Sequence, residues 1–186
     1  MQKPQNYDDT TAKSFGEFET LDPGGYICRI LKADATKSKS GKDMLVLEID
    51  VAEGESKGFF QRKLERESET NKEARWKCIY RQLTGGNSTG FFKGLITAIE
   101  ESNRGYTWNW EEKTLEGKIV GGVFGREQWE YNGKTGFKPE IKYVCSIETI
   151  KKGVKAPEDK LLENKDTLLG DGDFMLMDDL DMDCPF

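Results

Sequence analysis

Histidine is absent from the 186 residues of this chain, and its four cysteines (Cys28, Cys78, Cys145 and Cys184) form no C-x-x-C pair. Protein zinc sites are built mainly from these two residue types, so we expect no metal and no other cofactor. The lack of histidine also removes the commonest general base and every Ser-His or Cys-His nucleophile arrangement. We expect the first three cysteines to be buried free thiols.

Long apolar runs are missing as well. No segment approaches the length of a membrane span, and the N-terminal residues lack the basic stretch and apolar core of a secretory signal. We therefore expect a cytoplasmic protein that does not associate with membranes.

Negative charge is concentrated in the last part of the chain. Residues 158–186 hold ten of the 34 acidic residues but two of the 28 basic ones, which leaves 24 acidic and 26 basic residues in the remainder. The body therefore carries about +2 and the tail about −8. This asymmetry is typical of a nucleic-acid-facing domain with an acidic interaction tail.

Strand patterns dominate the first third of the chain. After turn residues 22–25, strands are predicted over 26–35 and 44–51, joined by a basic turn at 37–42, and a third strand is predicted over 58–64. The second strand alternates clearly, with Glu48 and Asp50 on the polar face. Its apolar face consists of Leu45, Leu47, Ile49 and Val51.

Two helices are predicted in the middle of the chain, one over 71–83 after Asn71 as N-cap and one over 92–99. The spacing i, i+3, i+4, i+7 is shared by Trp76, Ile79, Tyr80 and Leu83, and by Phe92, Leu95, Ile96 and Ile99. Strand signals return over 117–131, Asn132-Gly133 predicts a tight hairpin turn, and the returning strand runs to residue 150.

This order of elements predicts a mainly β (α+β) fold. We expect an OB-type five-stranded antiparallel barrel with a helical insertion between strands 3 and 4, followed by a disordered acidic tail. The expected domains are a flexible N-terminal arm (1–16), an OB-type nucleic-acid-binding domain (17–155) and the acidic tail (156–186). Other antiparallel α+β folds share the same order.

The C-terminal tip is the most specific motif, an aspartate-rich stretch that closes with Cys184-Pro185-Phe186. It resembles the tip of bacterial single-stranded-DNA-binding proteins, in which an apolar residue, proline and phenylalanine follow the aspartates. The resemblance implies that the terminal phenylalanine enters an apolar pocket on replication and repair proteins, while the aspartates meet basic residues around it. The implied docking residues are Asp178, Asp179, Asp181, Asp183, Cys184, Pro185 and Phe186.

Two features of this tip bear on docking. Cys184 stands where that family usually has an aliphatic residue, so we expect docking to be weaker rather than lost. Pro185 limits the entropy lost on docking. The alternative to partner docking is an acidic tail that only increases the solubility of the protein.

Residues 18–58 resemble a type of phage-encoded protein found with recombination genes, through Pro23-Gly24-Gly25-Tyr26 and Ser40-Gly41-Lys42. Both resemblances imply a role in replication or recombination, and in the host cytoplasm if a phage encodes the chain. Proteins similar to the single-stranded-DNA-binding family often assemble, so a homo-oligomer is possible.

The predicted DNA-binding residues are aromatic and basic side chains on the two hairpins and the third predicted strand. They are Lys37, Lys39, Lys42, Phe60, Arg62, Lys63, Arg126, Trp129, Tyr131, Lys134, Phe137 and Lys138. Bases stack on aromatic rings while cations follow the phosphates, which makes binding tolerant of sequence. Trp129 and Tyr131 are the best stacking candidates, because residues two apart on a strand share a face.

Several of these residues could have a purely structural role instead of binding DNA. Trp129 and Tyr131 could form an aromatic pair that closes the hairpin, and the lysines at 37–42 could belong to a solvated turn. Trp76 and Tyr80 are expected in the core. Trp108 and Trp110 cannot be placed from the sequence, and either would join the binding surface if it is exposed.

We expect no enzymatic activity. A metal-dependent nuclease could use Glu48 and Asp50, but position 52, where such a site places its lysine, is Ala52. Binding of single-stranded DNA with recruitment of partners is the preferred function. A strand-annealing recombination protein and a protein-only adaptor are the alternatives.

The acidic tail is predicted to compete with DNA for the basic surface. Deletion of residues 158–186 should tighten binding of single-stranded DNA, most visibly at low salt, because about −8 of charge is removed. Fluorescence anisotropy of a labelled oligonucleotide measures this affinity. Equal affinity with and without the tail would remove the competition and leave the docking role.

Overall fold

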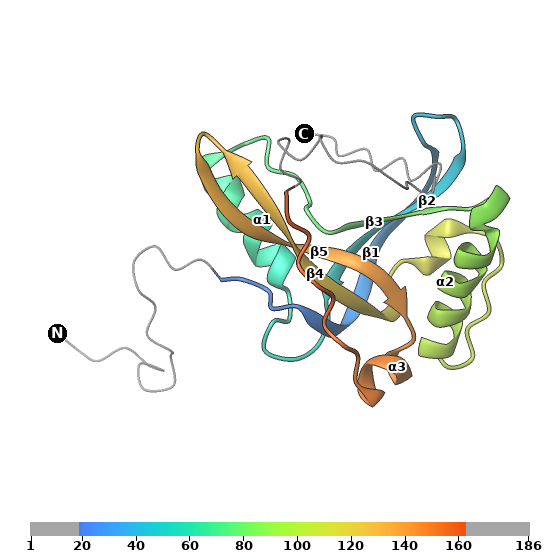
Figure 1. Cartoon of the computed structure of the whole chain (residues 1–186). Helices are drawn as coiled ribbons and strands as arrows, with labels where there is room; N and C mark the ends of the chain where they lie inside the picture. Colours follow the sequence, from blue (N-terminus) through green and yellow to red (C-terminus); the bar gives the residue numbers. More distant parts are fainter. Residues whose placement is uncertain (1–18, 163–186) are drawn as a thin grey trace, which may run out of the picture.

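The computed structural model describes residues 19–162, so the predicted N-terminal arm and the docking tip lie outside the described residues. Five antiparallel strands form one sheet in the order β3-β2-β1-β4-β5, and β3 approaches β5 so that the sheet nearly closes. This is the predicted OB-type barrel (Figure 1). The strands are β1 (Gly24–Lys37), β2 (Asp43–Val51), β3 (Ile79–Leu83), β4 (Ile119–Tyr131) and β5 (Lys134–Cys145).

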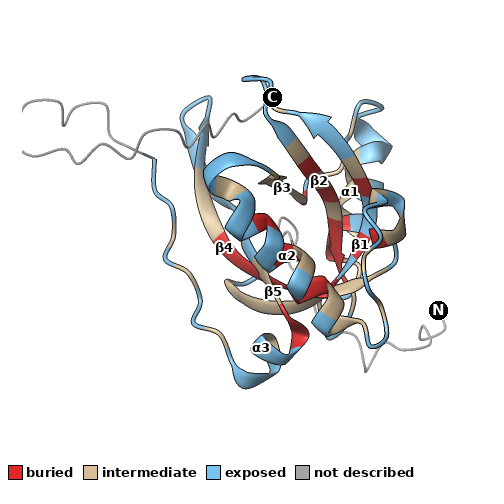
Figure 2. Ribbon diagram, turned by 90° about the vertical axis from the view of Figure 1, so that its right-hand side faces the viewer, coloured by how far each residue is buried: buried red, intermediate tan, exposed pale blue. Residues whose placement is uncertain are grey.

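Within residues 19–162, three α-helices accompany the barrel: α1 (Phe59–Thr70), α2 (Thr89–Ser102) and α3 (Ile147–Lys152). Helix α2 lies between β3 and β4 in the sequence, which confirms the predicted insertion. Its apolar stripe of Phe92, Leu95 and Ile99 is buried against the barrel. Figure 2 shows the buried residues gathered on the strands and on the facing side of α2.

The alternation in β2 is confirmed. Leu45, Leu47, Ile49 and Val51 are all buried in the core. Their neighbours Met44, Val46 and Glu48 are only partly buried, so they form the outer face of the strand.

The predicted third strand over 58–64 is wrong, because this segment begins α1. The residues after Phe60 are mostly good helix formers, and the helix extends to Thr70. Asp50 fixes its start from β2: its carboxylate accepts hydrogen bonds from the backbone N–H groups of Phe60 at 3.0 Å and Gln61 at 3.2 Å. Asp50 is therefore buried as a helix cap, which accounts for a carboxylate that sequence reasoning weighed as a metal ligand.

The predicted helix over 71–83 is also wrong. Its second half is strand β3, which pairs with β2 from Glu48↔Ile79 to Met44↔Leu83. Tyr80 faces the interior of the barrel opposite Leu47. Because apolar residues occur on both faces of this strand, they fall by chance at helical spacing. The predicted core position of Trp76 is confirmed, since its half-buried ring packs against the core. Its Nε1–H donates to the carbonyl of Cys78 at 2.9 Å.

The second hairpin has the predicted turn. Asn132 and Gly133 have φ angles of 51° and 70°, as a type I′ turn requires at both central positions. The returning strand ends at Cys145 rather than at residue 150, because Ser146 caps α3 by accepting a hydrogen bond from the Thr149 N–H.

Helix α3 packs on the outer side of β1 and β4, where glycines leave space for it. A Cβ at Gly121 would lie 2.5 Å from Cγ1 of Ile150, and one at Gly25 would overlap Ile150 and Val154. Val123, on this outer face, is fully buried as a result. The chain after α3 can therefore lie directly against the barrel and run back along β4.

The cysteine prediction is confirmed for Cys28 and Cys78, which are free and buried, whereas free Cys145 is only half-buried. Burial raises the pKa of Cys28 to about 12, so this thiol stays protonated at neutral pH. Within residues 19–162, no helix has the length and apolar character of a membrane span. The same described residues hold no group of three or more side chains arranged to bind a metal.

Replacing Asp50 by alanine should lower the free energy of unfolding by about 2–3 kcal/mol, because buried N–H groups at the start of α1 lose their acceptor. Urea denaturation followed by circular dichroism measures this change. Glu48→Ala, on the outer face of the same strand, is the control and should change stability by less than about 0.5 kcal/mol. An equal effect of both substitutions would contradict the role assigned to Asp50.

Candidate nucleic-acid interface

Two hairpins project from the barrel and carry most of the predicted DNA-binding residues. The β1–β2 turn, residues 37–42, is called the basic loop; the part of the β4–β5 hairpin over 125–140 is called the arm. Because β4 runs antiparallel to β1, the two leave the barrel at opposite ends of β1. In Figure 1 both tips nevertheless lie at the top of the molecule, with β3 between them.

The basic loop is held by its own hydrogen bonds. The N–H of Ser38 donates to the Lys42 carbonyl at 2.8 Å, and the N–H of Lys42 donates to Oγ of Ser38 at 3.1 Å. Lys37 forms an exposed ion pair with Asp43 at 2.8 Å, whereas Lys42 has no ion-pair partner among residues 19–162. The loop therefore presents Lys39 and Lys42 to solvent on a defined turn.

The arm has two faces, and the predicted residues divide between them. Cross-strand pairs Trp129↔Gly136 and Tyr131↔Lys134 lie on one face together with Lys138, which we call the tryptophan face. Arg126 and Phe137 lie on the other face, where the guanidinium of Arg126 is 5.2 Å from the centre of the Phe137 ring. Alternation along the strands separates these two sets.

The tryptophan face exposes two aromatic rings in different settings. Trp129 lies across Gly136, where a Cβ would come within 2.7 Å of its Cζ2, and the side chain is 38% exposed. Tyr131 is 71% exposed. Neither ring contacts another ring within the described part of the chain, so the two do not form the aromatic pair that was the structural alternative.

Residues 158–162, called the strap, pair with the edge of β4. The N–H of Lys160 donates to the carbonyl of Arg126 at 2.8 Å, and the N–H of Gln128 donates to the carbonyl of Lys160 at 2.8 Å. The N–H of Leu162 donates to Oε1 of Gln128 at 3.2 Å. The strap thus forms a parallel bridge between Lys160 and Glu127 at the edge of the arm, and ordered contacts with the barrel extend past the expected boundary at residue 155.

Ion pairs fix the strap to the arm. Both oxygens of Asp159 accept hydrogen bonds from Arg126, at 3.0 Å from Nε and 2.7 Å from Nη2, and the Arg126 side chain lowers the pKa of Asp159. Burial opposes ionisation of Glu127, but hydrogen bonds from Lys138 and Lys160 lower its pKa. Arg126 is thus engaged by the strap in this structure, and its predicted contact with DNA requires that this pair opens.

The three predicted residues of α1 have different surroundings, and Lys63 lies near enough to Lys138 of the arm for their charges to interact. Phe60 is 3% exposed and stacks on the ring of Phe124 inside the core, so its predicted place on a strand surface is wrong. Arg62 binds the carboxylate of Glu19 and the carbonyl of Lys57. Burial lowers the pKa of Lys63, whose side chain lies partly covered on the helix.

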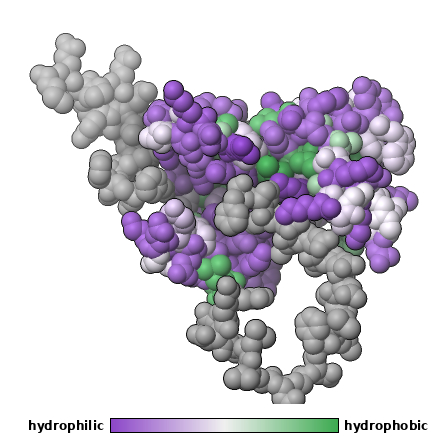
Figure 3. All heavy atoms as spheres, turned by 90° about the horizontal axis from the view of Figure 1, so that it is seen from above, coloured by the Kyte–Doolittle hydropathy of each residue, from purple (hydrophilic) through white to green (hydrophobic). Residues whose placement is uncertain are grey.

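The outer face of β2–β3 carries residues that the sequence did not reveal as part of a surface. Pairing places Met44, Val46, Arg81 and Leu83 side by side on it, and Arg81 is exposed. Assigning 71–83 to a helix concealed this face, since only strand alternation groups these residues. Figure 3, viewed from the side of the hairpin tips, shows a hydrophobic area surrounded by hydrophilic surface. Trp110, which the sequence could not place, is 78% exposed.

Comparison with known proteins adds little about function. A family model described as "Protein of unknown function (DUF669)" matches residues 5–85. This range includes β1, the basic loop, β2, α1 and β3, and it ends before α2 and the arm. No curated protein matches the chain.

Asp159→Asn should loosen the strap, because the amide cannot replace the charged partner of Arg126. Hydrogen exchange of the Gln128 and Lys160 amides should become faster, whereas Glu158→Gln, which removes the same charge from an exposed side chain, should leave both rates unchanged.

The same opening should occur at low pH. The Asp159 pKa lies below its ordinary value of 3.8, so the pair is intact above that value and is lost as the pH falls through the lowered pKa. Equal amide exchange rates in Asp159→Asn and Glu158→Gln would show that the Arg126–Asp159 pair does not hold the strap.

Proposed function

We propose that this protein binds single-stranded DNA without strong sequence preference in DNA replication or recombination, and recruits partner proteins through its C-terminal tip. The observation that carries the proposal is the exposed tryptophan face of the arm, on an OB-type barrel whose outer face over β2–β3 is partly apolar. OB-type barrels bind oligonucleotides on this face, between the loops that join β1 to β2 and β4 to β5.

The chemistry of this surface suits a single strand better than a duplex. Tyr131 and Trp129 offer ring faces, and Val46 and Leu83 offer apolar contact to exposed bases. In a duplex the base faces are stacked on one another and cannot reach such rings. Stacking does not distinguish one base from another, which supports sequence-tolerant binding.

Exposed cations suited to phosphate contact lie on the basic loop, on β3 and on the arm. Lys42, Arg81 and Lys134 have no ion-pair partner among residues 19–162 and are exposed. They lie on the basic loop, the outer face of β3 and the tip of the arm, respectively. A strand that crosses β2–β3 from the arm to the basic loop would meet all three, and each contact would release counterions.

The strap supports a link between the acidic tail and this surface. Leu162, the last described residue, is hydrogen-bonded to Gln128, so the described chain ends beside the arm. The predicted docking residues from Asp178 to Phe186 lie outside the described residues. A truncation that keeps the strap and removes 163–186 is therefore a cleaner test of tail competition than removal of 158–186.

Tyr131→Ala should weaken binding of a dT oligonucleotide by about 1–3 kcal/mol, because one exposed stacking ring is removed. Phe91→Ala is the matched control: this ring is 74% exposed but lies on α2, away from the arm. Anisotropy titrations at one fixed salt concentration compare the two variants with the unmodified chain. The interface is misplaced if Tyr131→Ala binds as well as Phe91→Ala.

A further inference from the structure

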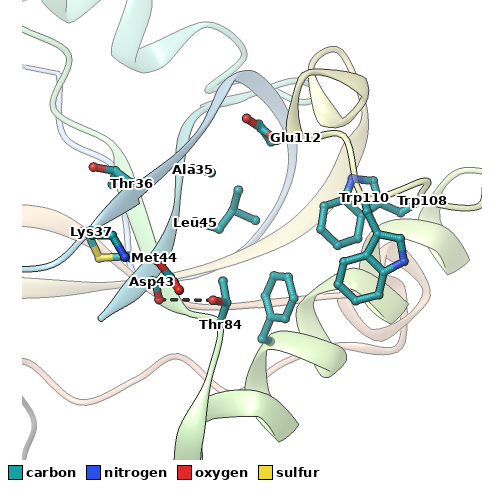
Figure 4. A pocket seen from close by; sticks show the side chains of 11 residues that line it. Ala35, Thr36, Lys37, Asp43, Met44, Leu45, Thr84, Trp108, Trp110 and Glu112 are labelled. Atoms are coloured by element: carbon teal, nitrogen blue, oxygen red, sulfur yellow. Dashed lines mark hydrogen bonds and ion pairs between the residues drawn. The ribbon is translucent and has the colours of Figure 1, made fainter. Parts of the chain in front are cut away.

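A hollow of about 400 Å³ lies beside the basic loop, at the end of the β1–β2 hairpin. Its wall includes Ala35 and Leu45 from the two strands, Phe92 from α2, and Trp108 and Trp110 from the chain that follows α2. Figure 4 shows the two indoles on one side of the hollow and Leu45 at its centre. The interior is mainly apolar and aromatic, which is typical of a site for a flat organic ring.

Trp108 forms a fixed support in this wall. Its backbone N–H donates to a carboxylate oxygen of Glu100 at 2.9 Å, and its Nε1–H donates to the carbonyl of Glu111 at 3.0 Å. Its ring packs edge-on against Phe92 with centroids 5.8 Å apart. Trp108 is thus held by both polar and aromatic contacts.

Trp110 is exposed at the mouth of the hollow, and both its exposure to water and its backbone conformation cost free energy. Its side chain is 78% exposed, and its φ of 67° lies in the left-handed region that a bulky residue rarely adopts. Its ring centre is 4.9 Å from that of Trp108, so the indole rests on a fixed neighbour and turns its remaining surface outwards. The core does not require this side chain, which is consistent with a binding role.

The hollow is continuous with the surface proposed to bind DNA. Met44 belongs to the outer face of β2 and also lines the hollow, and Lys37 of the basic loop lies at its rim. Thr84, directly after β3, also lines the hollow. The hollow is lined by one cation, Lys37, which pairs with Asp43, and Glu112 adds a second carboxylate. A phosphate at Lys37 would replace Asp43 as its partner. The aromatic carbon inside suits the base of a nucleotide, which is flat and largely apolar.

We infer that this hollow holds one nucleobase of the bound strand, stacked on Trp110, while the adjoining phosphates face Lys37 and Lys42. The inference rests on the proposed binding of single-stranded DNA and extends the proposed DNA-binding surface past the basic loop. An aromatic side chain of a partner protein is the rival occupant, and it would leave DNA affinity independent of Trp110.

Trp110→Gly tests the inference without endangering the fold, because glycine favours the φ of 67° found at this position. The affinity for a dT oligonucleotide should fall about 5- to 150-fold, while the midpoint of urea denaturation stays the same or rises. Phe91→Ala removes an exposed ring of α2 that does not line the hollow, and it should change neither the affinity nor the urea midpoint.

Photocrosslinking locates the base directly. Full-length protein is irradiated with a strand containing 5-iododeoxyuridine, and the modified peptides are identified by mass spectrometry. Crosslinks at both Tyr131 and Trp110 are expected. Crosslinks at Tyr131 alone, with unchanged affinity in Trp110→Gly, would overturn the nucleobase site and leave the proposed function standing. Absence of any binding to the strand would overturn both.

Discussion

The candidate interface depends on an edge of β4 that has no partner in β1. This edge lies where β4 extends beyond the first residue of β1. Gly24 pairs with Phe124, but β4 continues to Tyr131, so its outer N–H and C=O groups past Phe124 have no partner in β1. An isolated two-stranded ribbon is marginally stable in water. The strap supplies backbone partners to this edge through a bridge at Lys160, and the Arg126–Asp159 pair holds it there. The arm can therefore present Trp129 and Tyr131 as a defined surface.

The strap reaches this edge because two glycines leave room for the chain where it crosses the outer face of the barrel. Gly121 and Gly25 allow Ile150 and Val154 to rest directly on the backbone of β4 and β1. The same close packing buries Val123 on what would otherwise be an outer, solvated face. One set of glycines thus positions α3, the strap and the point at which the acidic tail begins.

Local signals in the sequence were sufficient for much of the fold. The Asn132-Gly133 turn and the alternation from Leu45 to Val51 depend on neighbours in sequence, and both were predicted. The exchange of helix and strand between 58 and 83 was not, because Asp50 caps α1 from another element and β3 is apolar on both faces.

The candidate site shows the same division between local and distant causes. Alternation alone placed Trp129 and Tyr131 on one face, and it also separates them from Arg126 and Phe137. The engagement of Arg126 by Asp159 joins residues 33 positions apart, and no local pattern signals it. The exposure of Trp110 depends on its support by Trp108 and on a left-handed backbone, neither of which composition or spacing reveals.

A comparison of single-stranded and duplex DNA tests the central claim most directly. Labelled dT and dA oligonucleotides and a matched duplex are titrated with full-length protein at moderate salt, with anisotropy and tryptophan fluorescence recorded together. The account predicts similar tight binding of both single strands, weak binding of the duplex, and quenching of tryptophan fluorescence by the single strands. Binding of no single strand, or equal binding of strand and duplex without quenching, would contradict it.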